Sequence, residues 1–255
     1  MKKIKIGLFG FGKTGKHVAQ EFLSDDHFEL VWVVKRTPEH NGKFASKLLG
    51  HEADKGVIHS LDKVDDNFFK NNPVDVLVDF SGSHGVRYYE KAADHGTKII
   101  SAISRYEEED LKRLKRLKKK TATLYSPNIT LGINFLLIAS QILKKIAPHA
   151  DIEIVEEHFR AKKEASGTAL KVAEILGLEK DKHVNSIRVG GVVGKHEIIF
   201  GLPNQTIRLV HESISKAAFG QGAIFAAKWL VNQTKGWYNM EGSISDLFRK
   251  NVPVY

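Results

Sequence analysis

A glycine-rich turn near the N-terminus constrains the fold of this chain more than any other feature. Gly10-Phe11-Gly12-Lys13-Thr14-Gly15 follows a short apolar run at residues 3–9 and opens a stretch in which apolar residues recur at helical spacing. A G-x-G-x-x-G sequence between a strand and a helix allows a tight turn and brings the backbone close to a pyrophosphate at the helix N-terminus. We therefore expect a dinucleotide to bind at Gly10, Gly12, Lys13, Thr14 and Gly15. A purely structural glycine turn is the alternative.

The first 126 residues alternate apolar strands with helices. Strands are predicted at residues 3–9, 30–34, 74–80, 98–102 and 122–125, and helices at 86–95 and 107–120. Apolar strands separated by helices are typical of a parallel sheet that is covered on both faces. Residues 37–72 are polar and poorly periodic, so no element is predicted there.

From residue 126 onward the pattern changes. Helices are predicted at 131–146, 168–176 and 217–232, and strand-like runs at 151–157, 186–200 and 205–213. The last two runs predict an antiparallel sheet with one buried face, because apolar and polar residues alternate along them. We therefore predict an α/β chain with a Rossmann-type dinucleotide-binding domain, formed by residues 1–126 and 217–255. A mixed α/β (α+β) substrate domain is inserted at residues 127–216.

Composition excludes several classes of protein. The chain has no cysteine, which removes disulfides, thiolate zinc sites, iron–sulfur clusters and cysteine nucleophiles. We expect no metal site. No apolar run reaches the roughly 18 residues that a membrane span needs, and the N-terminus lacks the apolar region and cleavage site of a signal peptide. We therefore expect a cytoplasmic protein with no membrane partner.

The chain is basic, with 39 Lys and Arg against 30 Asp and Glu. Seven of the ten residues at 111–120 are basic, and leucines there recur at helical spacing behind a run of acidic residues. Acidic residues at the start and basic residues at the end of a helix suit its dipole, so we expect a solvated helix face. A phosphate-binding or partner-binding surface is the alternative. No nucleic-acid partner is expected, because no zinc-finger, RNP or basic-zipper pattern is present.

A basic pair ends the second predicted strand. NAD-selective sites usually have an acidic residue there, which binds the ribose 2′-hydroxyl, but this chain has Lys35 and Arg36. Because two cations can neutralise a 2′-phosphate, we predict NADPH as the cofactor, with NADH possible. An exposed basic pair without a ligand is the alternative.

Polar residues that can bind a ligand or transfer a proton cluster where the strand at 151–157 ends. His158, two lysines and Ser166-Gly167-Thr168 fall within eleven residues. The start of a helix can hold a carboxylate through its free N–H groups, and a histidine moves protons near neutral pH. Taken singly, the serine or threonine is an ordinary helix cap and the histidine is structural. Their clustering predicts a substrate site.

This segment resembles the E-x-H-H-x(3)-K-x-D-A-P-S-G-T-A signature of the dihydrodipicolinate reductase (4-hydroxy-tetrahydrodipicolinate reductase) family. Glu157-His158, Lys162 and Ser166-Gly167-Thr168-Ala169 match it. Residues 187–200 are similar to the family's R-x-G-x-x-x-G-x-H-x-V-x-F segment, and residues 215–223 to its S-R-x-x-F-A-x-G-A segment. Residues 78–81 and 126–128 also fall in the family's order, so the resemblance covers nearly the whole chain.

Four features depart from the family pattern. Phe159 replaces its second histidine, Lys216 replaces an arginine, Ser101-Ala102-Ile103-Ser104 replaces a G-T-T-G loop, and the proline before Ser166 is missing. A lost polar partner costs about 1–3 kcal/mol if its site is buried and the partner is not replaced.

The resemblance implies reduction of dehydrated 4-hydroxy-tetrahydrodipicolinate to tetrahydrodipicolinate with NAD(P)H, in the synthesis of diaminopimelate and lysine. It implies that His158 and Lys162 are catalytic, and that the substrate, a small dicarboxylate, contacts Phe159, Ser166, Gly167, Thr168 and Lys216. It adds Phe80, Ser81, Ser101, Ala102 and Asn128 to the predicted cofactor site. Members are commonly homotetramers built through the sheet of the substrate domain, so this domain is also expected to mediate oligomerisation.

Two alternatives remain open from the sequence. One is a related dehydrogenase that acts on another amino or imino acid, which the changes at Phe159 and Ile103 allow. The other is a regulatory protein that binds NADPH without catalysis.

Overall fold

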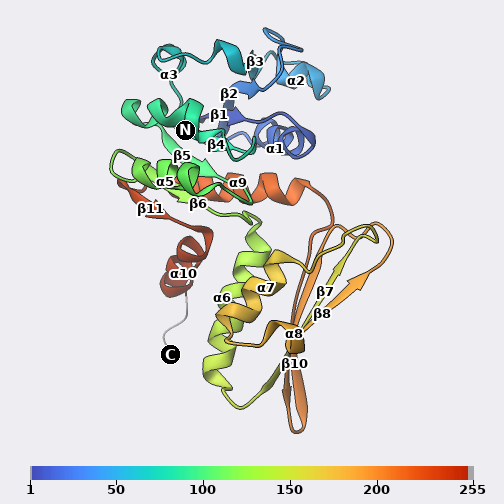
Figure 1. Ribbon diagram of the computed structural model, residues 1–255. Coiled ribbons are helices and arrows are strands. Elements are labelled where there is room, and N and C mark those ends of the chain that lie inside the picture. Colours follow the sequence, from blue (N-terminus) through green and yellow to red (C-terminus); the bar gives the residue numbers. More distant parts are fainter. Residues whose placement is uncertain (1, 252–255) are drawn as a thin grey trace. The chain divides into compact units, whose positions relative to one another are not determined.

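The computed structural model describes residues 2–251, which form two units (Figure 1). Within the described residues, unit 1 comprises 2–129 together with Phe219–Ser243. Unit 2 comprises Thr130–Ala218 and residues 244–251. The sequence predicted instead that all of residues 217–255 belong with the first domain. The division falls inside the last helix because the ring of Phe248 packs on Phe135 of unit 2, with centroids 5.2 Å apart.

Unit 1 is built on a seven-stranded sheet in the order β11-β6-β5-β4-β1-β2-β3, in which all pairs are parallel. The strands are β1 (Ile4–Phe9), β2 (Phe28–Lys35), β3 (Val57–Ser60), β4 (Val76–Asp79), β5 (Lys98–Ser101), β6 (Ala122–Tyr125) and β11 (Gly236–Tyr238). A parallel sheet needs cover on both faces, and apolar residues fill both. The predicted α/β fold class is confirmed.

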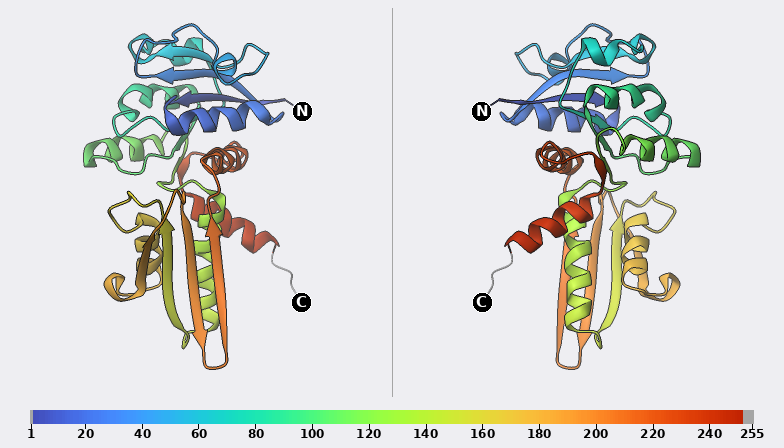
Figure 2. Two further views of the ribbon diagram at one scale, coloured as in Figure 1. Left: turned by 90° about the vertical axis from the view of Figure 1, so that its right-hand side faces the viewer. Right: turned by 90° about the vertical axis from the view of Figure 1, so that its left-hand side faces the viewer.

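Two sets of helices provide that cover (Figure 2). The elements of unit 1 are α1 (Lys13–Ser24), α2 (Ala45–Leu48), η1 (Leu61–Lys63), α3 (Phe68–Asn71), α4 (Val86–Tyr89), η2 (Glu90–His95), α5 (Glu108–Leu117) and α9 (Ala217–Leu230, which begins in unit 2). Side chains of α3, α4, η2 and α5 pack in one core cluster with Phe9, Trp32 and Leu77 of the sheet. Helices α1 and α9 lie on the other face, where Gly220 of α9 approaches Val18 of α1. Within α5, Leu114 and Leu117 are buried.

Unit 2 has a four-stranded mixed sheet in the order β10-β9-β7-β8. Its elements are α6 (Leu131–Ile146), β7 (Asp151–His158), α7 (Gly167–Ile175), α8 (Lys180–His183), β8 (Val184–Arg188), β9 (Lys195–Leu202) and β10 (Gln205–Glu212), and α10 (Met240–Asn251) ends there. Strand β9 pairs antiparallel with β7 and β10, whereas β8 pairs parallel with β7. Apolar side chains from α6 and α7 cover one face.

The single run predicted at residues 186–200 is wrong. It comprises two strands, β8 and β9, that lie on opposite sides of β7. Three glycines fall between or beside them, and Gly190 has φ 50°, in the left-handed region. Glycine adopts that backbone at no steric cost, so the chain turns there and crosses β7 instead of continuing straight.

None of the helices within residues 2–251 is both long and apolar enough to span a membrane.

Candidate active site

The glycine-rich turn brings two strand ends into close contact. Gly10 has φ 99°, and a Cβ atom there would lie 2.6 Å from the carbonyl oxygen of Phe80, at the end of β4. A Cβ at Gly15 would lie 2.0 Å from the carbonyl oxygen of Gly10, whereas the space beside Gly12 is open. No side chain caps α1, so backbone N–H groups at its start are left for another acceptor. This cradle fits the pyrophosphate of a dinucleotide.

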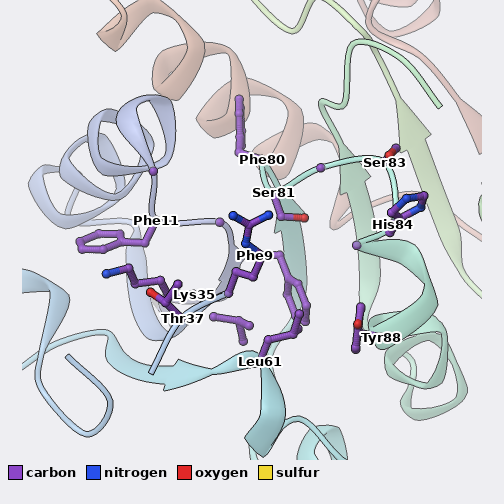
Figure 3. Close-up of a pocket in the computed structure, with 16 residues that line it drawn as sticks. Phe9, Phe11, Lys35, Thr37, Leu61, Phe80, Ser81, Ser83, His84 and Tyr88 are labelled. Atoms are coloured by element: carbon purple, nitrogen blue, oxygen red, sulfur yellow. The ribbon is translucent and has the colours of Figure 1, made fainter. Parts of the chain in front are cut away.

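A cavity of about 570 Å³ opens beside this turn (Figure 3). Figure 3 shows Phe11 and Lys35 on one side of it and His84 and Tyr88 on the other. The predicted cofactor residues among its lining are Gly10, Gly12, Lys35, Arg36, Phe80 and Ser81. The remaining predicted ones, Lys13, Thr14, Gly15, Ser101, Ala102 and Asn128, do not line it. The first three lie in α1, Ser101 ends β5, Ala102 follows it, and Asn128 follows β6.

The basic pair at the end of β2 is split between two environments. Lys35 Nζ lies 2.5 Å from Glu39 Oε2, so its charge is already paired. Arg36 is exposed and lines the cavity, and it has no ion-pair partner within residues 2–251. Of the two, Arg36 is the cation that an incoming anion can engage.

The hydroxyl groups of Ser81, which lines the cavity, and of Ser101 are both engaged in hydrogen bonds within unit 1. The hydroxyl group and the N–H of Ser81 both donate to the buried carboxyl group of Asp79, at 2.6 and 2.8 Å. Ser101 Oγ lies 2.7 Å from the hydroxyl of Tyr106, which in turn lies 3.5 Å from Asp79. Sequence analysis did not single out Asp79, although an aspartate at the end of a wholly buried strand marks it.

In unit 2, a second buried carboxylate holds the predicted catalytic histidine. Glu156 and His158 point to the same buried face of β7, and His158 Nδ1 hydrogen-bonds to Glu156 Oε2. Arg188 of β8 donates from Nη1 and Nη2 to the two oxygens of Glu156, at 2.9 and 2.6 Å. Ser186 Oγ and the N–H of Ser166 donate to Oε1, at 2.6 and 3.2 Å. Glu156 is thus a fully hydrogen-bonded anion.

The family signature was matched above at Glu157, but the structure places Glu156 against the histidine. Adjacent residues in a strand point to opposite faces, so Glu157 lies on the other side of β7, where Lys195 Nζ donates to it at 2.7 Å. The glutamate of the signature is therefore Glu156 rather than Glu157.

Opposing effects set the charges in this network. Burial raises the pKa of Glu156, but hydrogen bonds from Arg188, Ser186, His158 and Ser166 outweigh it and lower the pKa to about 2. Burial lowers the pKa of His158, and the nearby cations Lys162 and Arg188 add to that effect, whereas Glu156 partly reverses it. An anion therefore orients an imidazole that gives up its proton readily.

A second histidine, which sequence analysis did not select, completes the cluster. His196 of β9 lies edge-on to His158 with ring centroids 5.3 Å apart, and its Nε2 is 2.8 Å from Ser166 Oγ. Its Nδ1 is buried without a hydrogen-bond partner within the described chain. Burial is the main cause that lowers the pKa of His196 to about 4. His196 lies 30 positions from Ser166 in the chain, and the fold brings it to both Ser166 and His158.

Ser166 precedes α7 but does not cap it. Its hydroxyl contacts His196 instead, so it leaves the N–H groups at the start of α7 without a cap from that side chain. Gly167 adds no side chain, and the space beside its Cα is open. The start of a helix in this state is suited to a carboxylate.

The predicted catalytic residue Lys162 and the predicted substrate residues Phe159 and Lys216 contact this network less closely. Lys162 is half-buried, and its backbone carbonyl accepts from Arg188 Nε at 2.9 Å, whereas Lys163 is exposed. Phe159 is 44% exposed, and Lys216 is exposed just before α9. The structure shows no hydrogen bond between these last two side chains and the Glu156 network within residues 2–251.

Comparison with known proteins identifies what this chain resembles. The profile for the N-terminus of dihydrodipicolinate reductase matches residues 4–129, and that for its C-terminus matches residues 129–244. The 4-hydroxy-tetrahydrodipicolinate reductase of Syntrophus aciditrophicus is 31% identical, over 94% of this chain and 97% of that protein. The protein of the same name from Caldanaerobacter subterraneus is 32% identical, over 94% and 95%.

The fold also matches solved structures. A dihydrodipicolinate reductase from Paenisporosarcina sp. TG-14, solved with dipicolinate, superposes with a TM-score of 0.76 at 21% identity and covers 94% of this chain and 99% of that one. An amine dehydrogenase from Mycobacterium smegmatis superposes with a TM-score of 0.65 at 12% identity, over 94% and 96%.

Proposed function

The chain belongs to the dihydrodipicolinate reductase family, and on that premise we propose that it reduces 4-hydroxy-tetrahydrodipicolinate, after loss of water, to tetrahydrodipicolinate. The product serves diaminopimelate and lysine synthesis. The observation that carries the proposal is the anchored histidine of unit 2, His158, bound to a buried glutamate beside the open start of α7. Family membership favours this reductase over another amino- or imino-acid dehydrogenase and over a non-catalytic NADPH-binding protein.

Unit 1 supplies the cofactor site in this proposal. The glycine cradle and the uncapped start of α1 fit a pyrophosphate, and the adjoining cavity accommodates the adenosine half of a nicotinamide dinucleotide. When bound, the reduced nicotinamide supplies a hydride. We assign NADPH as the preferred form because Arg36 is unpaired at the position where a 2′-phosphate is recognised.

Unit 2 supplies the proton and the charge. Hydride addition leaves negative charge on the substrate, and one proton is needed to balance the reaction. His158 holds that proton on Nε2 while its Nδ1–H remains bonded to Glu156. A Cβ at Gly194 would lie 3.0 Å from this Nε2, so glycine leaves room beside it. Lys162 offsets the developing negative charge. The N–H of Ser166 donates to Glu156, so the N–H groups of Gly167 and Thr168 hold the carboxylate.

We extend the proposal to a homotetramer assembled through the sheet of unit 2. Helices α6 and α7 cover one face of this sheet, and the other face exposes Ile187 and Val210 to 44% and 51% among charged residues. Light scattering should give the mass of four chains for the wild type and a smaller mass for Val210→Asp.

The test of the function is an assay of NADPH and NADH oxidation with freshly generated 4-hydroxy-tetrahydrodipicolinate, beside a panel of amino and keto acids. His158→Ala should lower kcat by about 10²–10⁴, as expected for loss of a general acid. Lys162→Ala should raise the barrier by about 2–4 kcal/mol. Binding of NADPH should be unchanged in both variants.

Lys163→Ala is the matched control, because Lys163 is the exposed neighbour of Lys162. Full activity in all three variants would refute the mechanism. Damage confined to Lys163→Ala would show that the signature is aligned one residue out of register in this loop.

A further inference from the structure

Unit 1 buries a carboxylate that the proposed reaction does not use. Asp79 ends the wholly buried strand β4 and is 0% exposed. Its Oδ1 accepts the hydroxyl and the N–H of Ser81, at 2.6 and 2.8 Å. Its Oδ2 accepts the hydroxyl of Tyr89 at 2.9 Å and, more weakly, that of Tyr106 at 3.5 Å.

All of these donors are neutral. Tyr89 faces the carboxyl group from α4, and Tyr106 faces it from the loop before α5, with Tyr125 of β6 packed behind Tyr106 at 5.6 Å between ring centroids. His84, near this cluster in the chain, turns its Nδ1 to Asp110, which also binds Arg87. Within residues 2–251, no lysine, arginine or histidine hydrogen-bonds to Asp79. Burial raises the pKa of Asp79 to about 6, although these donors act against it.

The residues that Asp79 holds form one wall of the cofactor cavity. Phe80 and Ser81 both line it, and the carbonyl of Phe80 lies against Gly10 of the phosphate-binding turn. Through Tyr106, the same carboxyl group connects to Ser101 at the end of β5. Asp79 therefore fixes the turn after β4 against the ends of two neighbouring strands.

We propose that Asp79 is a positioning residue for the cofactor, whose ionised carboxyl group holds the turn at Phe80 and Ser81 in the shape that dinucleotide binding requires. The inference rests on the proposed cofactor site in unit 1. Hydrogen bonds to a charged acceptor are roughly twice as strong as those between neutral groups. Protonation of Asp79 weakens both bonds from Ser81, loosens the turn and lowers the affinity for the dinucleotide.

Ionisation of Asp79 lowers the free energy of unfolding, although it favours binding of the dinucleotide. The folded-state pKa of Asp79 lies above the ordinary value of 3.8, so its proton favours the folded protein, and that contribution is lost as the pH rises through about 6. A purely structural role would favour a neutral side chain of the same shape. Asparagine provides that side chain, with one oxygen to accept from Ser81 and an amide group to donate to Tyr89.

The experiment measures the dissociation constant of NADH for the wild type and Asp79→Asn between pH 5 and pH 8. NADH is the probe because it lacks the 2′-phosphate, whose own ionisation falls in this range. At pH 8 the variant should bind about ten-fold more weakly, the loss expected when charged hydrogen bonds become neutral. At pH 5 the two proteins should bind alike, because the wild type is then protonated. The thermal midpoint of the variant at pH 8 should not fall below that of the wild type.

Asp75→Asn is the matched control. Asp75 precedes β4 at the opposite end of the strand, where it accepts the N–H of Lys5 at 2.7 Å, and its exchange should leave NADH binding unchanged at both pH values. Tyr89→Phe is the second variant, for use if Asp79→Asn does not fold. It removes one donor and should move the midpoint of the pH dependence upward by up to about one unit.

Equal NADH affinity of the wild type and Asp79→Asn at pH 8 would overturn the inference, as would the same ratio of affinities at both pH values. Failure of the wild type to bind either dinucleotide would instead refute the proposed cofactor site, and the inference with it.

Discussion

The two units each bury a carboxyl group beside a proposed ligand site, and the two groups ionise in opposite ways. Asp79 in unit 1 and Glu156 in unit 2 are both 0% exposed. The pKa of Asp79 rises to about 6, because burial dominates and its partners are neutral hydroxyl and amide groups. The pKa of Glu156 falls to about 2 despite its burial, because Arg188 contacts both oxygens and further donors add to it.

The difference shows that partners, rather than burial alone, decide the charge of a buried acid. Glu156 is therefore an anion near neutral pH, which suits a residue that orients an imidazole. Asp79 changes its charge just below neutral pH. Unit 2 therefore carries an internal charge pair beside the proposed substrate site, whereas unit 1 presents its unpaired cation, Arg36, to the cavity that we propose for the cofactor.

The largest effect is expected from Glu156→Gln. Loss of the anion leaves Arg188, which is 19% exposed, without its counter-charge. Breaking a buried pair in this way costs about 3–5 kcal/mol in the free energy of unfolding, measurable by urea denaturation, and kcat should fall because His158 loses its anchor. The matched control is Glu157→Gln on the other face of β7, which should be close to wild type. A Glu156→Gln variant as stable and active as the wild type would show that the charge of Glu156 is not required, and would contradict the contrast drawn here with Asp79.

A smaller effect is expected from Arg36→Asp, which tests whether the charge of unit 1 acts on the ligand. The KM for NADPH should rise about ten- to hundred-fold, as expected for loss of a hydrogen bond to a charged group, whereas the KM for NADH and the stability should change little. Lys35→Ala is the control and should have a weaker effect, because Lys35 is already paired with Glu39. Equal rises in the KM for NADPH and for NADH would show that Arg36 does not recognise the 2′-phosphate.

The smallest effect is the pH dependence of stability. The contribution of Glu156 is present above its ordinary pKa of 4.5 and is lost as the pH falls toward about 2. Asp79 acts in the opposite direction, so Asp79→Asn should be more stable than the wild type at pH 8, by about 1 kcal/mol, and the difference should vanish below pH 4. Thermal unfolding across this range measures both trends. If the wild type were more stable than Asp79→Asn at pH 8, the raised pKa of Asp79 would be contradicted.

Much of the fold follows from local patterns in the sequence. Continuous apolar runs predicted five of the seven strands of unit 1, and helical spacing predicted α6 with its observed bounds. The two strands of unit 1 that were missed are short: β3 has four residues and β11 has three, and the twelve-residue helix α10 was also missed. Neither strand is long enough to show periodicity, and each exists because a neighbouring strand pairs with it.

The candidate site was less predictable because its contacts are distant in sequence. The spacing of His158 and Ser166 was visible, but Arg188 reaches Glu156 across 32 positions and His196 reaches Ser166 across 30. One signal was available. In β7, Glu156 occupies the same alternating phase as the buried residues Ile152 and Ile154, and a glutamate in that phase indicates a buried, paired carboxylate.

The pairing of β11 with β6 also sets the order in which the sheet of unit 1 can form during synthesis. Domains emerge from the ribosome in sequence order, and β6 is synthesised more than a hundred residues before its partner at Gly236–Tyr238. Until then β6 is an open sheet edge, the kind of surface that promotes aggregation. The larger segment of unit 2, Thr130–Ala218, is translated within that interval, before the sheet of unit 1 can close. A nascent chain that ends anywhere in Thr130–Ala218 therefore exposes the edge of β6 that β11 later covers.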